Sequence, residues 1–111
     1  MAFVALEVSV QLISSLKRPM ELLQRSDRHL TEQVRKAMNS VSLNLGEGRR
    51  RGGRDRLQRF RIAAGSASEV HTALRVALAW GCFEEAAVAE SMRHLDRLQG
   101  LLWALTHGRA G

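Results

Sequence analysis

Residues 46–53, GEGRRRGG, separate two long amphipathic patterns and decide how the chain folds. The first two glycines supply the permissive backbone at which helices commonly end, and the next helix is expected to begin around the last two. With the residues that follow, the stretch 46–61 reads GEGRRRGGRDRLQRFR. It could be a phosphate-cradling loop, a flexible RNA-binding arm or a hinge between two helices. The sequence on either side favours the hinge.

Apolar residues recur every three or four positions in four segments, at about residues 2–24, 28–48, 53–79 and 84–107, which is the spacing of an amphipathic helix. The residues expected to face the core are Leu6, Val10, Ile13 and Met20 in the first segment, Leu30, Val34, Met38, Val41 and Leu45 in the second, Phe60, Ala63, Ala67, Val70, Leu74 and Ala77 in the third, and Val88, Ser91, Leu95, Leu98, Leu102 and Leu105 in the fourth.

Short connections make neighbouring helices antiparallel, so the sequence predicts an all-α, up-down-up-down four-helix bundle that forms one domain, residues 1–111. Pro19 lacks an amide hydrogen and should kink or restart the first helix near Arg18. Ser26, Asp27 or Thr31 can cap the second helix, and Gly81 is expected to end the third.

Several function classes find no support in the composition. Cys82 is the single cysteine, and the apolar N-terminus has neither the basic start of a secretory signal nor the roughly 18 apolar residues of a membrane span, so a cytoplasmic protein without membrane association is expected. The glycine-rich stretch lacks the GK[ST] ending of a phosphate loop. The histidines do not form a helical metal-ligand pair, and no nucleophile or paired-carboxylate motif is present. We therefore expect no enzymatic activity, no metal and no cofactor.

Positive charge is concentrated in one region. Residues 1–61 carry 13 basic and 6 acidic side chains, a net charge of +7, whereas residues 62–111 carry 4 basic and 5 acidic ones, −1. Residues 49–61 alone hold seven arginines and one acid. A field of this kind favours an anionic partner, most simply a nucleic acid backbone. A helical protein with a merely basic rim is the other interpretation of the same composition.

The order of motifs from Leu30 onward is more specific. LTEQVRKAMNSVSLNLGEG, RIAAGSASEV and AWG resemble the bacterial four-helix-bundle family encoded by intervening sequences in 23S rRNA genes, a group that includes accessory variability proteins of diversity-generating retroelements. The family pattern runs L-T-x-Q, S-I-P-A-N-I-A-E-G, I-A-x-G-S-x-x-E and L-G-Y. The matching residues are Leu30, Thr31, Gln33, Ser40, Asn44, Glu47, Gly48, Ile62, Ala63, Gly65, Ser66, Glu69 and Gly81.

This resemblance implies an antiparallel four-helix bundle, often assembled into a homopentameric ring with basic surfaces, and no known enzymatic activity. In the retroelement branch such a ring binds a reverse transcriptase and nucleic acid. The sequence departs from the pattern at Ser42, where the family has proline, and at Cys82, where it has an aromatic residue. Glu47, Gly48, Gly65, Ser66 and Glu69 are assigned structural or interface roles on this basis.

The arginines of residues 49–61 divide by helical phase into two groups. Those expected to contact phosphate are Arg49, Arg50, Arg51, Arg54 and Arg61. Arg56 and Arg59 project towards the core side, where an unpaired guanidinium is costly, so they should reach the bundle end or find Glu47, Asp55 or a carboxylate of a neighbouring subunit.

Apolar residues beyond the needs of one core, Leu57, Ile62, Leu101 and Trp103, favour self-association. Two functions stay open. The first is an oligomeric accessory protein that binds RNA or DNA through charge, without base-specific readout. The second is a protein-interaction scaffold whose arginines serve subunit contacts or an acidic partner.

Overall fold

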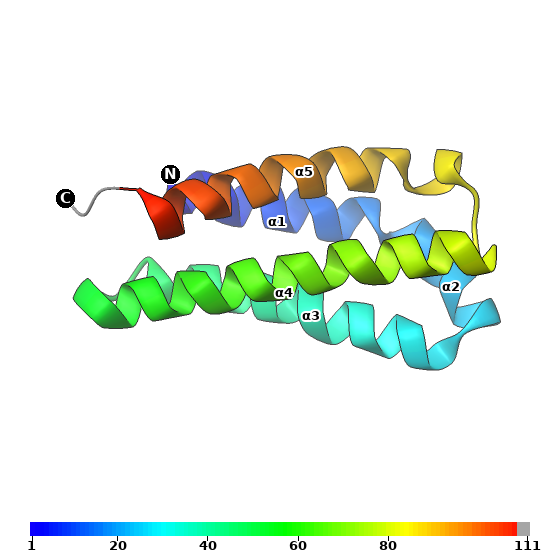
Figure 1. Cartoon of the computed structure of the whole chain (residues 1–111), viewed down its shortest axis with the longest axis horizontal. Coiled ribbons are helices and arrows are strands. Elements are labelled where there is room, and N and C mark those ends of the chain that lie inside the picture. Colours follow the sequence, from blue (N-terminus) through cyan, green and yellow to red (C-terminus); the bar gives the residue numbers. More distant parts are fainter. Residues whose placement is uncertain (109–111) are drawn as a thin grey trace.

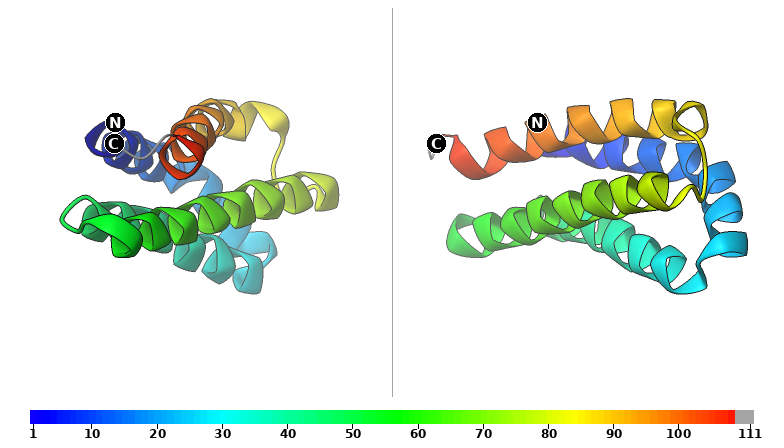
Figure 2. Two further views of the ribbon diagram at one scale, coloured as in Figure 1. Left: turned by 60° about the vertical axis from the view of Figure 1, so that its left-hand side comes forward. Right: turned by 45° about the vertical axis from the view of Figure 1, so that its right-hand side comes forward.

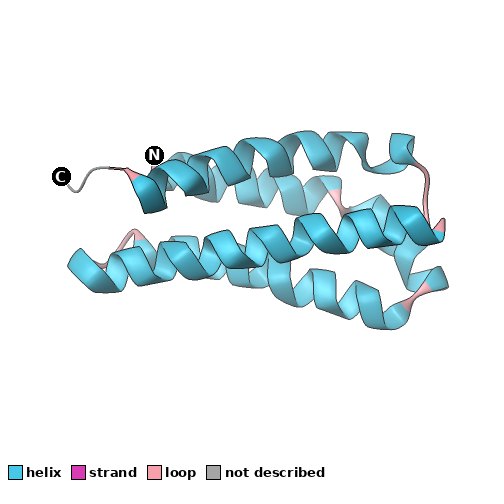
Figure 3. Cartoon of the chain, viewed as in Figure 1, coloured by secondary structure: helices cyan, strands magenta, loops and turns pink. Residues whose placement is uncertain are grey.

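The computed structural model describes residues 1–108, which form five α-helices and no strand. The helices are α1 (Ala2–Ser15), α2 (Lys17–Ser26), α3 (Arg28–Gly48), α4 (Gly53–Trp80) and α5 (Glu85–His107). In Figures 1 and 3 the four longer helices lie side by side along the long axis of a 44 × 22 × 20 Å molecule, and α2 crosses from α1 to α3 at one end.

The helices pack in a closed cycle, in which α3 contacts α4, α4 contacts α5, α5 contacts α1, and α1 contacts α3. Each helix in the cycle runs opposite to its two neighbours (Figure 2). As a result, the start of α1, the end of α5 and the connection between α3 and α4 all lie at one end of the molecule (Figure 1).

The first expected segment, residues 2–24, forms two helices, α1 and α2, so the chain restarts close to Arg18 as Pro19 indicates. Leu16 separates them with φ −84° and ψ −7°, and its amide hydrogen is shared between the carbonyls of Leu12 and Ile13. Pro19 is the third residue of α2. Amides in the first turn of a helix have no intrahelical acceptor, so the missing amide hydrogen of Pro19 breaks no hydrogen bond within α2. The restart at Lys17 therefore lies one residue before the expected site at Arg18.

The expected first helix has its predicted apolar stripe at the edge of the core, where Leu6, Ile13 and Met20 are half-buried. The buried face of α1 consists of Ala2, Ala5, Val8, Ser9 and Leu12, whereas Val10 is 48% exposed. The small side chain of Ala5 lets α1 lie close to its neighbours, and the larger residues of the expected stripe occupy the flank. For α3, α4 and α5, the expected core residues are buried, except that Leu105 is half-buried.

Hydroxyl pairs join the helices inside this core. Ser9 Oγ lies 2.9 Å from Ser42 Oγ between α1 and α3, and Ser15 Oγ lies 2.8 Å from Ser91 Oγ between α1 and α5. Within residues 1–108, no buried side-chain polar atom lacks a hydrogen-bond partner. These bonds fix the axial position of α1, because a shift along the helix would leave hydroxyls unpaired in an apolar core.

The helix ends follow local chemistry. Asp27 caps α3, where its Oδ1 accepts a hydrogen bond from the Leu30 amide at 2.9 Å. Gly81 ends α4 in the left-handed conformation, with φ +76°, as the sequence indicates. No helix within the described residues is long and apolar enough to cross a membrane.

Candidate nucleic-acid interface

The α3–α4 corner, defined here as residues 46–61, contains the end of α3, a short connection and the first turns of α4. The amides of Arg49, Arg50 and Arg51 remain hydrogen-bonded to carbonyls of the last turn of α3, at 3.1 Å each. Gly53 then begins α4 with φ +59°, a value that L-residues rarely adopt. The connection is therefore a tight, hydrogen-bonded turn, which agrees with the hinge interpretation and not with a free arm.

Gly48 is buried where the end of α3 packs against α4. A Cβ at this position would lie 2.6 Å from Phe60 Cε1 and 3.1 Å from Arg59 Cβ. Phe60 is only 2% exposed and belongs to the core, so its ring has little room to move. The absence of a side chain at Gly48 thus sets the spacing of the two helices that carry the arginines.

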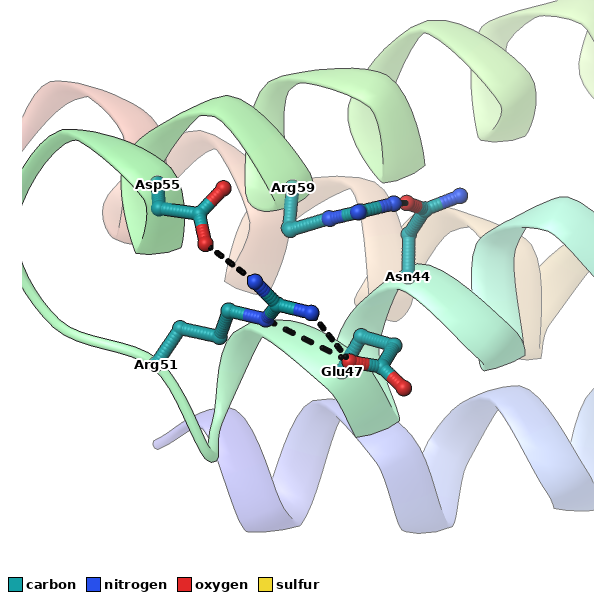
Figure 4. A network of polar contacts seen from close by, with 5 residues as sticks. All are labelled: Asn44, Glu47, Arg51, Asp55 and Arg59. Atoms are coloured by element: carbon teal, nitrogen blue, oxygen red, sulfur yellow. Dashed lines mark hydrogen bonds and ion pairs between the residues drawn. The ribbon is translucent and has the colours of Figure 1, made fainter.

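Arg51 joins the two sides of the connection (Figure 4). Its Nη1 donates to Asp55 Oδ2 at 2.7 Å, and its Nε and Nη2 donate to Glu47 Oε2 at 3.4 and 3.3 Å. The hydrogen bond to Asp55, the charge of Asp55 and the contacts with Glu47 together raise the pKa of Arg51 above its ordinary value. Arg51 was expected to be free for phosphate, but its guanidinium already has two carboxylate partners.

Four other arginines of the corner extend from the surface: Arg49, Arg50, Arg54 and Arg61 are exposed. Within residues 1–108, none of the four forms an ion pair. Arg49 lies over the exposed ring of Phe3 on α1, with Cζ 5.0 Å from the ring centroid. Their charge is therefore available to an external anion.

Arg56 and Arg59 are half-buried, as their helical phase indicates. Arg56 Cζ lies 5.1 Å from the centroid of the Phe60 ring, and Arg59 Nη1 donates to Asn44 Oδ1 at 3.3 Å. Figure 4 shows Arg59 extending along the surface of α4 towards Asn44 on α3. The carboxylates expected for this pair, Glu47 and Asp55, are instead bound by Arg51.

A chain of polar contacts continues from Arg59 along the α3–α4 seam. Asn44 Nδ2 donates to the Ser40 carbonyl at 2.8 Å, and Ser66 Oγ donates to Ser40 Oγ at 2.8 Å. Ser66 thus joins α4 to α3 through this hydrogen bond. Gly65 and Glu69, by contrast, are exposed on α4, and a Cβ at Gly65 would contact nothing within 4 Å.

Sequence reasoning missed two arrangements. The Arg51 bridge has a sequence signal, since Glu47 and Asp55 lie four residues before and after Arg51. Such spacing predicts an ion pair within one helix, whereas here a helix ends between the partners. The second arrangement is a stacked pair at the end of α5, Trp103 and His107, also four residues apart. Among residues 1–108, no group of three or more metal-ligating side chains comes together.

A family profile described as the 23S rRNA-intervening sequence protein matches residues 5–104. The chain belongs to this family. Its membership confirms the resemblance seen in the motifs around Gly48 and Ser66.

A crystal structure of a protein of unknown function, from the S23 ribosomal protein family of Bacteroides thetaiotaomicron VPI-5482, has a similar fold, with a TM-score of 0.82. The two chains are 14% identical over 92% of this chain and 97% of the other. At that identity the likeness shows the fold alone. No curated protein matches the chain.

Proposed function

We propose that this protein is an oligomeric, non-enzymatic accessory protein that binds nucleic acid through its α3–α4 corner without reading base sequence. The observation that carries the proposal is the division among the arginines of the corner. Arg51 is held by two carboxylates, whereas four exposed arginines around it have no ion-pair partner within residues 1–108. Cations held on a rigid turn attract phosphate, and phosphate contacts carry no sequence information by themselves.

The proposal includes an architecture and an assembly. The chain is taken as an up-down-up-down four-helix bundle whose first member is α1 extended by α2, and five copies are taken to form a ring. Support for assembly comes from apolar side chains that remain exposed: Val4, Val10, Leu43, Ile62 and Val76. Of the other residues that the sequence favours for this role, Trp103 is exposed, whereas Leu57 and Leu101 are half-buried. Light scattering at micromolar concentration tests the assembly, and the mass of a single chain would contradict it.

Repetition of the corner in a ring would place several arginine clusters on one assembly in the bacterial cytoplasm. A reverse transcriptase is a candidate protein partner, because it is the partner in the retroelement branch that the motifs resemble. The corner would then hold RNA or DNA beside that enzyme.

Fluorescence anisotropy with a labelled oligonucleotide at 150 mM NaCl tests the nucleic-acid role. The triple variant Arg49→Ala, Arg50→Ala, Arg54→Ala should bind more weakly, and the slope of log K against log salt should fall by up to about 2 for a single strand. The matched control removes three exposed cations elsewhere, Lys36, Arg75 and Arg93. Equal slopes in the two triple variants would refute the assignment to the corner.

A protein-interaction scaffold is the second candidate, favoured by a groove of about 430 Å³ between the α1–α2 junction and α3. Ile13, Met20 and Met38 supply apolar walls, while Lys17 and Arg35 stand at its rim. Flexible methionine side chains adapt to varied apolar partners. If the protein shows no affinity for RNA or DNA at 150 mM salt, the scaffold becomes the better-supported function.

A further inference from the structure

Trp103 and His107 form an exposed stack of two aromatic rings on the last turns of α5. Their ring centroids lie 4.7 Å apart and their planes differ by 6°. His107 Nδ1 lies 3.1 Å from the Trp103 carbonyl and 3.0 Å from Thr106 Oγ1, and Thr106 Oγ1 in turn donates to the Leu102 carbonyl at 2.8 Å. The imidazole is thus held by the helix in the orientation that supports the indole.

His107 covers one face of the indole and leaves the other face without a stacked ring among residues 1–108. Because His107 covers the face towards the C-terminus, the second face is directed along the helix towards the preceding turn, where residue 100 is a glycine. A Cβ at Gly100 would contact nothing within 4 Å, so close packing does not explain a glycine in the middle of α5. Trp103 remains 62% exposed, so much of the indole is accessible to a ligand.

The α3–α4 corner can supply positive charge to an anionic ligand that stacks on Trp103. The end of α5 and the α3–α4 corner lie at the same end of the molecule (Figure 1). An aromatic face beside a positively charged surface is the combination that single-strand-binding proteins use, with bases stacked on rings and phosphates held by cations.

We propose that Trp103, supported by His107, is a stacking platform for an unpaired nucleobase, so that the nucleic-acid partner of this protein is single-stranded. The inference rests on the proposed function and specifies the strandedness of the ligand. Bases inside a duplex already stack on their neighbours and present only their edges in the grooves, so a duplex can contact the corner but not the platform. The arginines of the corner then contribute affinity for any strand, and Trp103 contributes the preference for unpaired bases.

The chain contains two tryptophans, which allows each to be observed separately. Trp80 ends α4 at the opposite end of the molecule from the corner and is 78% exposed. The variant Trp80→Phe leaves Trp103 as the only indole, and Trp103→Phe leaves Trp80. Both are titrated at 150 mM NaCl with an oligothymidylate and with a duplex of equal length, and indole fluorescence and anisotropy are recorded.

The single strand should quench the fluorescence of Trp80→Phe through stacking on Trp103, the duplex should not, and Trp103→Phe should show little change with either ligand. Trp103→Ala should weaken single-strand binding about 5- to 150-fold and leave duplex binding unchanged. Gly100→Leu adds a side chain one turn before the indole, uses a good helix former and retains the indole, and it should reproduce the loss.

Three results would overturn the platform while leaving the nucleic-acid role intact: equal quenching in the two single-tryptophan proteins, equal quenching by duplex, or wild-type single-strand affinity in Trp103→Ala. A fall in oligomer mass in Trp103→Ala would reassign the residue to a subunit interface and would also overturn it. Absence of binding to either ligand in the wild-type protein would overturn the proposed function together with the platform.

Discussion

Replacement of Gly48 by alanine tests the close approach that sets the α3–α4 corner. The added methyl group would lie 2.6 and 2.9 Å from two atoms of the Phe60 ring, well inside van der Waals contact, and 3.1 Å from Arg59 Cβ. Overpacking of this kind typically costs about 1–3 kcal/mol. Alanine also gains up to about 1 kcal/mol of helix propensity over glycine, although less at a helix end, where Gly48 lies. The overpacking cost should prevail, with a net loss of about 1–2 kcal/mol in the free energy of unfolding.

Urea denaturation followed by circular dichroism at 222 nm measures this loss, and two protein concentrations separate folding from assembly. Gly65→Ala is the matched control, because Gly65 is an interior helical glycine whose added Cβ would contact nothing within the chain. It should stabilise the chain by up to about 1 kcal/mol. The cost of Gly48→Ala should also shrink in a Phe60→Leu background, since the smaller side chain relieves the contact. A Gly48→Ala protein as stable as the wild type would refute the reasoning.

Three further substitutions test separate contacts. Arg51→Ala should lower the melting temperature slightly at low salt but not in 1 M NaCl, because salt screens exposed ion pairs. It should also reduce oligonucleotide affinity less than Arg50→Ala does, because Arg51 already has carboxylate partners. A larger loss of affinity in Arg51→Ala than in Arg50→Ala would contradict this. Asp27→Ala removes the cap of α3 and should cost about 1 kcal/mol in urea denaturation, whereas Asp27→Asn should retain most of that stability. Ser66→Ala breaks the hydrogen bond to Ser40 and should cost about 0.5–1.5 kcal/mol, and an unchanged urea midpoint would show that the bond contributes nothing.

The sequence predicts α3, α4 and α5 well, since the residues that helical spacing places on the core side are buried there, with Leu105 half-buried. In α1, two neighbouring stripes are both apolar. Periodicity ranked the larger residues of one stripe, such as Leu6 and Val10, above the smaller ones of the other, such as Ala5. In the structure the stripe with the smaller residues is buried, because α1 packs closely between α3 and α5. The apolar pattern of one helix does not contain that information.

For the α3–α4 corner, the sequence predicts the charges but not their ion-pair partners. The position and sign of the charge follow directly from the sequence, and helical phase correctly places Arg56 and Arg59 on the half-buried side. The partners do not follow, because the Arg51 bridge spans two helices whose relative position depends on the turn between them. Composition therefore identifies a cluster of arginines, but it does not separate Arg51, which is paired with two carboxylates, from the arginines without an ion-pair partner within residues 1–108.

The residues that carry the family resemblance have mainly structural roles along the seam between α3 and α4. Ser40, Asn44 and Ser66 form the polar seam between α3 and α4, and Gly48 sets the distance between these helices. Such residues explain why the chain has the fold of its family, and they contain no group that selects a ligand. The groups that can select one are Arg49, Arg50 and Arg54 beside the seam and Trp103 on α5, which lie outside the motifs. Since the motifs maintain the scaffold and the proposed contact residues lie outside them, relatives can share the fold without sharing these residues, and the proposed partner has to be tested on the chemistry of this surface.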